Sequence, residues 1–255
     1  MNQQTGKVRV LGIGIDPLTT DQLHERITQI IDSGRKALVL NVNVHCMNLA
    51  QRHPWLKELL NSAEVVFCDG AGVRLGARLL GYELPERITY ADWMWQLAEL
   101  ASTRGHTLYF LGSAPGVAAR AADVLRARFP ALEIVGAHHG YFAKEGGEND
   151  AVIAQINAAH PDILVVGMGM PLQEQWLAQN WDRVDAHVFL TGGACFDYVS
   201  GTLRRCPRWM ADHSLEWLYR LLQEPRRLFR RYVVGNPTFL LRILLERARM
   251  GRRSA

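Results

Sequence analysis

Residues 162–171 read DILVVGMGMP, an apolar run that ends in glycines and a proline. Such a continuous run, rich in β-branched residues, is typical of a strand buried on both faces of a parallel sheet. Comparable runs predict strands at 8–15, 37–43, 64–69, 107–112, 132–137 and 186–193. Between these runs, apolar residues at helical spacing predict helices at 19–34 and 93–105. For the first helix, we expect Thr20 as the N-cap and Gly34 as the residue that ends it. This alternation predicts an α/β fold: a Rossmann-like, mostly parallel sheet with helices on both faces.

No strand is predicted after Ser200. Residues 214–234 and 237–253 read as two helices broken near Gly235–Pro237. Residues 201–255 hold 13 Arg, no Lys and 4 acidic residues, a balance of +9, whereas residues 1–200 balance at −5. We therefore expect two units: an α/β domain over residues 1–200 and a helical, Arg-rich appendage over residues 201–255.

Several classes of protein are disfavoured by missing motifs. No apolar run of 18 or more residues occurs, and residues 1–8 lack the apolar segment of a secretory signal. Neither a GxGxxG dinucleotide fingerprint nor a GxxxxGK phosphate loop is present, and no nucleic-acid-binding motif is readable. No HxH, HExxH or DxD pattern indicates a metal, so we expect neither a metal nor a cofactor. The four cysteines form no CxxC pair and read as reduced thiols of a cytosolic protein.

Special residues stand where several predicted strands end. Gly112, Gly167 and the pair Gly192–Gly193 turn strands into helices, where free backbone N–H groups favour phosphate. Alternatively, these glycines only make tight turns. Asp69 follows the apolar run EVVFC, and apolar neighbours would raise its pKa toward that of a general base. Its alternative role is to cap the next helix.

The Arg-rich appendage interleaves cations with large apolar side chains. Trp217, Phe229 and Tyr232 lie among these arginines, a pattern typical of amphipathic helices on anionic membrane surfaces. Alternatively, the arginines form a solvated face of helices packed against the core.

A series of motifs resembles the WecG/TagA/CpsF family of bacterial glycosyltransferases (glycosyltransferase family 26) over roughly residues 8–235. The motifs that carry this resemblance are Asn41-Val42-Asn43, Asp69-Gly70, Glu86-Arg87 with Asp92, LGSAPGVA (111–118), GYF (140–142), Gly169-Met170-Pro171-Leu172-Gln173-Glu174, Gly192-Gly193 with Phe196-Asp197, and LEWLYRLLQEPRR (215–227).

The resemblance implies a hexosyltransferase that moves a hexose, an N-acetylhexosamine or its uronic acid from a UDP-sugar to a polyprenyl-diphosphate-linked saccharide. It further implies an inverting, metal-independent reaction in exopolysaccharide or cell-wall polymer synthesis, at the cytoplasmic face of the inner membrane. The implied base is Asp69. Implied donor-binding residues are Asn41, Asn43, Arg87, Gly112, Gln173 and Asp197, and implied diphosphate-binding residues are Arg220, Arg227 and Arg230.

Three residues depart from the family pattern: Asn41 for Thr, Tyr90 for Gly and Cys206 for Ala. The first two lie near the donor site, so the identity of the sugar stays open. The sequence also leaves open the acceptor and homo-oligomerisation. Arg226 and Arg231 are expected to serve membrane binding more than chemistry. Two other functions remain as alternatives: a Rossmann-type nucleotide-sugar oxidoreductase, and a non-enzymatic module that binds anionic lipid.

Overall fold

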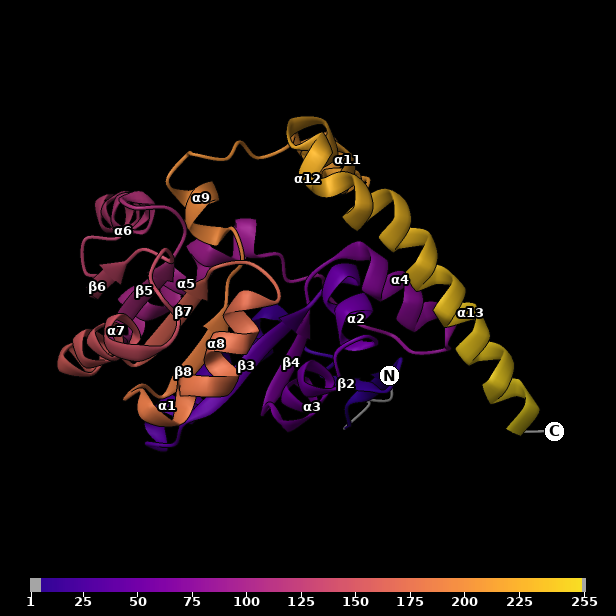
Figure 1. Ribbon diagram of the computed structural model, residues 1–255, viewed down its shortest axis with the longest axis horizontal. Helices are drawn as coiled ribbons and strands as arrows, with labels where there is room; N and C mark the ends of the chain where they lie inside the picture. Colours follow the sequence, from indigo (N-terminus) through magenta and orange to yellow (C-terminus); the bar gives the residue numbers. More distant parts are fainter. Residues whose placement is uncertain (1–5, 254–255) are drawn as a thin grey trace.

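The computed structural model describes residues 6–253, and its centre is a six-stranded sheet in the order β4-β3-β8-β7-β5-β6 (Figure 1). All five strand pairings in this sheet are parallel, which confirms the predicted Rossmann-like α/β fold. The strands are β3 (Ala37–Val42), β4 (Val65–Cys68), β5 (Leu108–Gly112), β6 (Ile134–His138), β7 (Ile163–Gly167) and β8 (Val188–Thr191).

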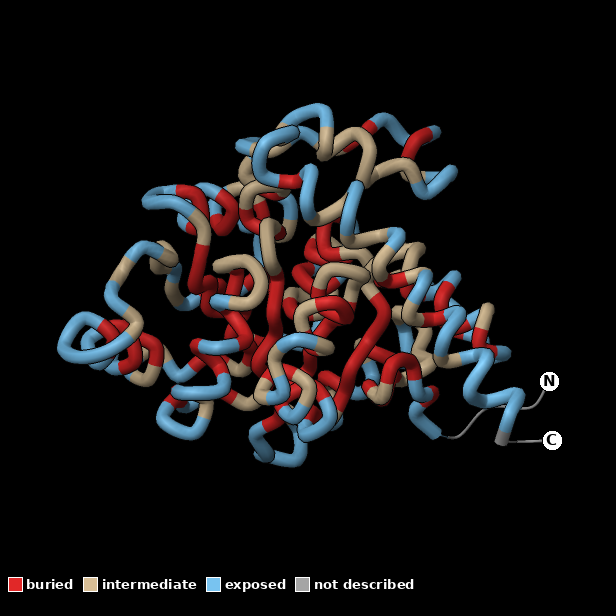
Figure 2. The backbone as a smooth tube through the Cα atoms, turned by 45° about the vertical axis from the view of Figure 1, so that its right-hand side comes forward, coloured by how far each residue is buried: buried red, intermediate tan, exposed pale blue. Residues whose placement is uncertain are grey.

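Helices cover both faces of the sheet, and the core is buried between the layers (Figure 2). Strand side chains alternate, so that Val39 and Phe67 face one helical layer while Leu40 and Val66 face the other. One layer holds α1 (Thr20–Asp32), α5 (Tyr90–Arg104), α6 (Val117–Arg128) and α9 (Cys195–Val199). The other holds α2 (Val44–Ala50), α3 (Pro54–Ser62), α4 (Ala71–Leu79), α7 (Gly146–Ala159) and α8 (Leu172–Asn180), which a 3₁₀ turn (Trp181–Arg183) follows.

The prediction of one strand over residues 8–15 was wrong. These residues form an antiparallel hairpin of β1 (Val8–Val10) and β2 (Ile13–Ile15), outside the main sheet. The chain reverses at Leu11 and Gly12, whose φ angles of 51° and 74° are those of a tight hairpin turn. Because a leucine rarely adopts positive φ, the apolar run gave no sign of this turn.

The N-cap of α1 is Thr19 rather than the expected Thr20. Gln22 N–H donates to the Thr19 hydroxyl, and the Gln22 side chain accepts from Thr19 N–H, which makes a capping box. The helix ends before Gly34, which has the left-handed φ of 66° expected of a stop.

The appendage is helical, but its main break is not at Gly235–Pro237. It consists of α10 (Arg208–Asp212), α11 (Glu216–Gln223), α12 (Pro225–Phe229), a π-helical turn (Arg230–Val234) and α13 (Gly235–Arg253). The break between α11 and α12 comes before Pro225, which is tolerated as the first residue of a helix. At Pro237 the helix continues, because the wide turn before it changes the bonding partners: Gly235 N–H donates to Arg230 C=O.

Helix α13 packs along α2 and α4 (Figure 1). Phe239 and Ile243 of α13 are buried in the hydrophobic core cluster that covers one face of the sheet. A Cβ on Gly76 of α4 would lie only 2.7 Å from Phe239 Cζ, so glycine permits this approach. Arg242 Nη1 donates to Asn48 Oδ1 over 2.6 Å, which fixes α13 to α2. Within residues 6–253 no helix is both long enough and apolar enough to span a membrane.

Candidate active site

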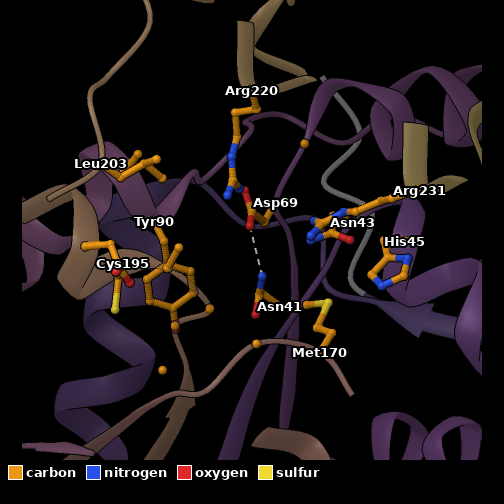
Figure 3. Close-up of a pocket in the computed structure, with 18 of the residues that line it drawn as sticks. Asn41, Asn43, His45, Asp69, Tyr90, Met170, Cys195, Leu203, Arg220 and Arg231 are labelled. Carbon is orange, nitrogen blue, oxygen red and sulfur yellow. Dashed lines mark hydrogen bonds between the residues drawn. The ribbon is translucent and has the colours of Figure 1, made fainter. Parts of the chain in front are cut away.

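A pocket of about 1580 Å³ lies across the carboxyl edge of the sheet, where ligands bind in open parallel sheets. Every strand of the main sheet is followed by a residue that lines it, and the appendage forms the opposite wall (Figure 3). The strand-end residues are Asn43, Asp69, Ser113, Gly140, Met168 and Gly192, and the appendage contributes Glu216, Trp217, Arg220, Arg227, Arg231 and Tyr232.

Asp69 sits in this pocket directly after β4 and is held by hydrogen bonds. Asn41 Nδ2 donates to Asp69 Oδ2 over 3.0 Å, and the Thr89 side chain hydrogen-bonds the same carboxyl group. Asn41 is itself oriented by Thr191, whose hydroxyl donates to Asn41 Oδ1 over 2.9 Å. The capping alternative does not apply, because the N-cap of α4 is Gly70 and has no side-chain cap hydrogen bond.

The pKa of Asp69 is raised to about 6. Burial is the main cause, and the negative charge of Glu216 adds to it. Hydrogen bonds from Thr89 and Asn41 and the charge of Arg231 act in the opposite direction. At neutral pH the group is therefore ionised, yet its pKa lies within the range that suits a general base.

Three of the other implied donor-binding residues line the pocket beside Asp69. Asn43 does so while its Oδ1 caps α2 by accepting from Cys46 N–H over 3.0 Å. Arg87 and Asp197 line the same pocket. Asp197 accepts from the Ser113 hydroxyl over 2.7 Å, which joins α9 to the loop after β5.

Gly112 and Gln173 lie behind the pocket lining, where they support it. A Cβ on Gly112 would fall 2.1 Å from Gly167 C=O, so glycine allows β5 to approach β7 there. Gln173 is fully buried, and its Oε1 accepts from Gly169 N–H over 3.1 Å and Gly193 N–H over 3.0 Å. The amide thus ties the loop after β7 to the loop after β8, which is a positioning role.

Of the arginines implied for diphosphate binding, Arg220 and Arg227 line the pocket, but Arg230 is exposed and does not. Arg231, expected to serve the membrane, lines the pocket instead. The spacing could not signal this, because α11 and α12 are broken at Glu224 and Arg231 lies in a π-helical turn. The buried Nε atoms of Arg220 and Arg231 have no hydrogen-bond partner among residues 6–253.

Sequence reasoning missed an ion-pair network on the appendage wall. Arg205 donates to Asp92 of α5 over 2.5 and 3.1 Å and also pairs with Glu216 of α11. This fastens α11 to the body and sets the Glu216 carboxylate in the pocket with Asp69. Nothing in the sequence marked Arg205, since its partner Asp92 is 113 residues away.

His45, also missed, is a half-buried pocket residue whose pKa is lowered to about 4. Burial is the main cause, followed by the charges of Arg231 and Arg52. The imidazole is therefore neutral at physiological pH. Over the part of the chain that the structure describes, no three His, Cys, Asp or Glu side chains are grouped to hold a metal ion. All four cysteines are buried and unpaired.

A parallel sheet covered on both faces, with a large pocket across its strand ends, defines a Rossmann-like α/β protein. The chain belongs to the Glycosyl transferase WecG/TagA/CpsF family, whose sequence model matches residues 8–253. Its relatives include N-acetylglucosaminyldiphosphoundecaprenol N-acetyl-beta-D-mannosaminyltransferases of Staphylococcus aureus strains MW2 and MRSA252. Each is 28% identical over 241 residues, which cover 94% of this chain and 92% of the relative.

Proposed function

We propose that this protein is a glycosyltransferase that moves a hexose or N-acetylhexosamine, or its uronic acid, from a UDP-sugar to a polyprenyl-diphosphate-linked saccharide. The observation that carries the proposal is a carboxylate with a pKa of about 6, Asp69, in a pocket walled by Arg220 and Arg231. This arrangement offers a base for a sugar hydroxyl and cations for a diphosphate. Membership in the family and the names of the relatives support the same activity.

In the proposed reaction, Asp69 accepts the proton of an acceptor hydroxyl as its oxygen attacks the anomeric carbon. The new C–O bond forms on the face opposite the departing UDP, so the anomeric centre inverts. The electron pair of the broken bond stays on the diphosphate of UDP, where Arg220 stabilises the developing charge. Asn41 and Thr89 hold Asp69 in place.

The direct test is a screen of UDP-sugars with the purified full chain and a short-chain polyprenyl-diphospho-sugar acceptor. One UDP-sugar is expected to yield UDP and an extended lipid-linked product in equal amounts. Hydride transfer with NADH instead would favour an oxidoreductase. Binding of anionic lipid with no turnover of any donor would favour a non-enzymatic module.

Transfer is expected to continue in EDTA, because the arginine wall supplies the positive charge that the leaving diphosphate needs. The measurement is the initial rate with and without chelator, and then with added Mg²⁺ or Mn²⁺. A rate that EDTA abolishes and Mg²⁺ restores would show the metal-free mechanism to be wrong.

The appendage is proposed to place the catalytic domain on the anionic cytoplasmic face of the inner membrane, as a peripheral protein. Leu222, Phe229 and Leu241 are 71%, 57% and 59% exposed on it, among many arginines. Each cation near an anionic surface adds about 1 kcal/mol of attraction that salt screens. Binding to phosphatidylglycerol vesicles is therefore expected to fall steeply as the salt concentration rises from about 50 to about 500 mM, because the Debye length shortens over this range. Binding that salt leaves unchanged, or equal binding to neutral vesicles, would contradict this.

A further inference from the structure

The pocket has two chemically different halves. Around Asp69 the lining is polar, with Asn41, Asn43, Ser113 and Asp197. A second set of lining residues is apolar and comes mostly from other elements: Val44 of α2, Leu75 of α4, Met170 of the loop after β7, Leu172 at the start of α8, and Phe239 and Leu240 of α13. We call this second half the apolar arm.

Close contacts between three helices form the walls of the apolar arm. A Cβ on Gly72 of α4 would lie 2.4 Å from Val44 Cγ2, and one on Gly76 would lie 2.7 Å from Phe239 Cζ. The two glycines thus let α2 and α13 approach α4 closely. Leu75, between them in sequence, remains 47% exposed although it lines the pocket. An exposed leucine in a concave wall is typical of a binding site for an apolar group.

Cations stand where the apolar arm meets the polar half. Figure 3 shows Arg231 near Asn43 and His45, and Arg220 above Asp69. The pKa of Arg231 is lowered, mainly by burial, and its Nε has no hydrogen-bond partner in residues 6–253. A buried cation without such a partner is costly unless an anion completes its hydrogen bonds.

Three pocket residues of the appendage lie one after another along the same helical surface. Arg231, Asn236 and Leu240 all line the pocket. They are spaced by five and four residues, one π-helical and one α-helical turn, so they share one side of this helical segment, and Arg231 is the one whose charge acts on Asp69. From base to cation to apolar wall, the pocket thus matches a molecule that carries a sugar, then a diphosphate, then a hydrocarbon chain.

We propose that the apolar arm between α2, α4 and α13 binds the first isoprene units of the acceptor lipid. Arg231 then holds its diphosphate, while Arg220 stays with the diphosphate of the donor, and the terminal sugar of the lipid reaches Asp69. This inference rests on the proposed function, which supplies the class of acceptor.

The test is calorimetric binding of farnesyl diphosphate and of inorganic diphosphate to the full chain, without membrane or detergent. Burial of the first branched apolar units is expected to make farnesyl diphosphate about tenfold or more tighter. Leu75→Asp is expected to remove most of this preference and leave the affinity for inorganic diphosphate unchanged. Leu245→Asp is the matched control, because Leu245 is 51% exposed on α13 but does not line the pocket.

Equal affinities for the two diphosphates, or equal losses in Leu75→Asp and Leu245→Asp, would overturn the inference. Circular dichroism of both variants checks folding, and Leu240→Asn provides a second substitution in the arm if Leu75→Asp fails to fold.

A parallel assay of sugar transfer separates this inference from the proposed function. If the chain prefers farnesyl diphosphate to inorganic diphosphate but transfers no sugar to any lipid acceptor, the proposed function is wrong and the inference about the apolar arm is supported. If sugar is transferred with a KM independent of chain length and farnesyl diphosphate is not preferred, the arm alone fails.

Discussion

Asp69→Asn is expected to lower the turnover number by about 10²–10⁴-fold, the range for loss of a general base. The amide keeps the shape of the carboxyl group and can still hydrogen-bond Asn41 and Thr89, but it cannot take a proton from the acceptor. Because the pKa of Asp69 is about 6, the wild-type kcat/KM should rise with pH through that value and then level off. The measurement is the pH-rate profile of both proteins, together with the affinity for UDP, which should change little.

Stability provides the control for Asp69→Asn. Since the folded-state pKa of Asp69 lies above the ordinary value of 3.8, the folded state binds more protons than the unfolded state between about pH 4 and pH 6. The contribution of Asp69 to the free energy of unfolding therefore falls as pH rises through this window. Asp69→Asn should be at least as stable as wild type at pH 7, and any advantage should shrink below pH 4. A variant with near-normal turnover would remove Asp69 from catalysis.

Most of the fold was predictable because five of the six strands of the main sheet are buried on both faces. A continuous apolar run such as 162–169 has no polar face to expose, so it predicts a strand covered on both sides. The carboxyl ends of parallel strands then meet at one edge of the sheet. That edge was enough to place Asp69 and Asn43, which follow two strands of the sheet, in one pocket, whereas Asp197 was singled out only through the resemblance. The hairpin over residues 8–15 was missed because its turn depends on positive φ at Leu11, which no residue type there signals.

The finer architecture of the site depends on contacts that are distant in sequence. Arg205 joins Asp92 to Glu216 across three elements, and Gln173 joins two strand-end loops. Such roles follow from tertiary packing, and hydrophobic periodicity carries no information about them. Gln173 was singled out only through resemblance, which indicated that the residue matters but not that it acts from behind the pocket wall.

Truncation after Ser200 is a poor test of the appendage, although the expected loss of transfer is large. Phe239 and Ile243 of α13 are buried in the core cluster of one sheet face. Removing them would expose apolar surface of the catalytic domain and destabilise it, since a buried large apolar side chain contributes about 2–5 kcal/mol. A sharper test changes single side chains on the pocket wall and leaves the helix packing intact.

Arg231→Ala and Arg230→Ala make a matched pair for this purpose. The two arginines are neighbours in the same π-helical turn, with the same intrinsic effect on the helix and the same change in net charge. Arg231 lines the pocket and exerts an electrostatic effect on Asp69, whereas Arg230 is exposed. If Arg231 holds a diphosphate of the bound substrates, its loss should lower kcat/KM by about 10²–10³-fold, as for removal of one preorganised donor worth about 2.7–4 kcal/mol.

Arg230→Ala should change kcat/KM by less than about threefold with a water-soluble acceptor, since an exposed cation contributes little to chemistry inside a pocket. Both variants should lose a similar, small part of their affinity for anionic vesicles, because each lowers the net charge of the appendage by one. The rate measurement therefore separates the two roles while the vesicle measurement does not. Equal losses of kcat/KM in the two variants would show that the appendage acts through its net charge. A larger loss in Arg230→Ala would restore the assignment that the resemblance implies, with the π-helical turn rotating in the substrate complex to bring Arg230 inward.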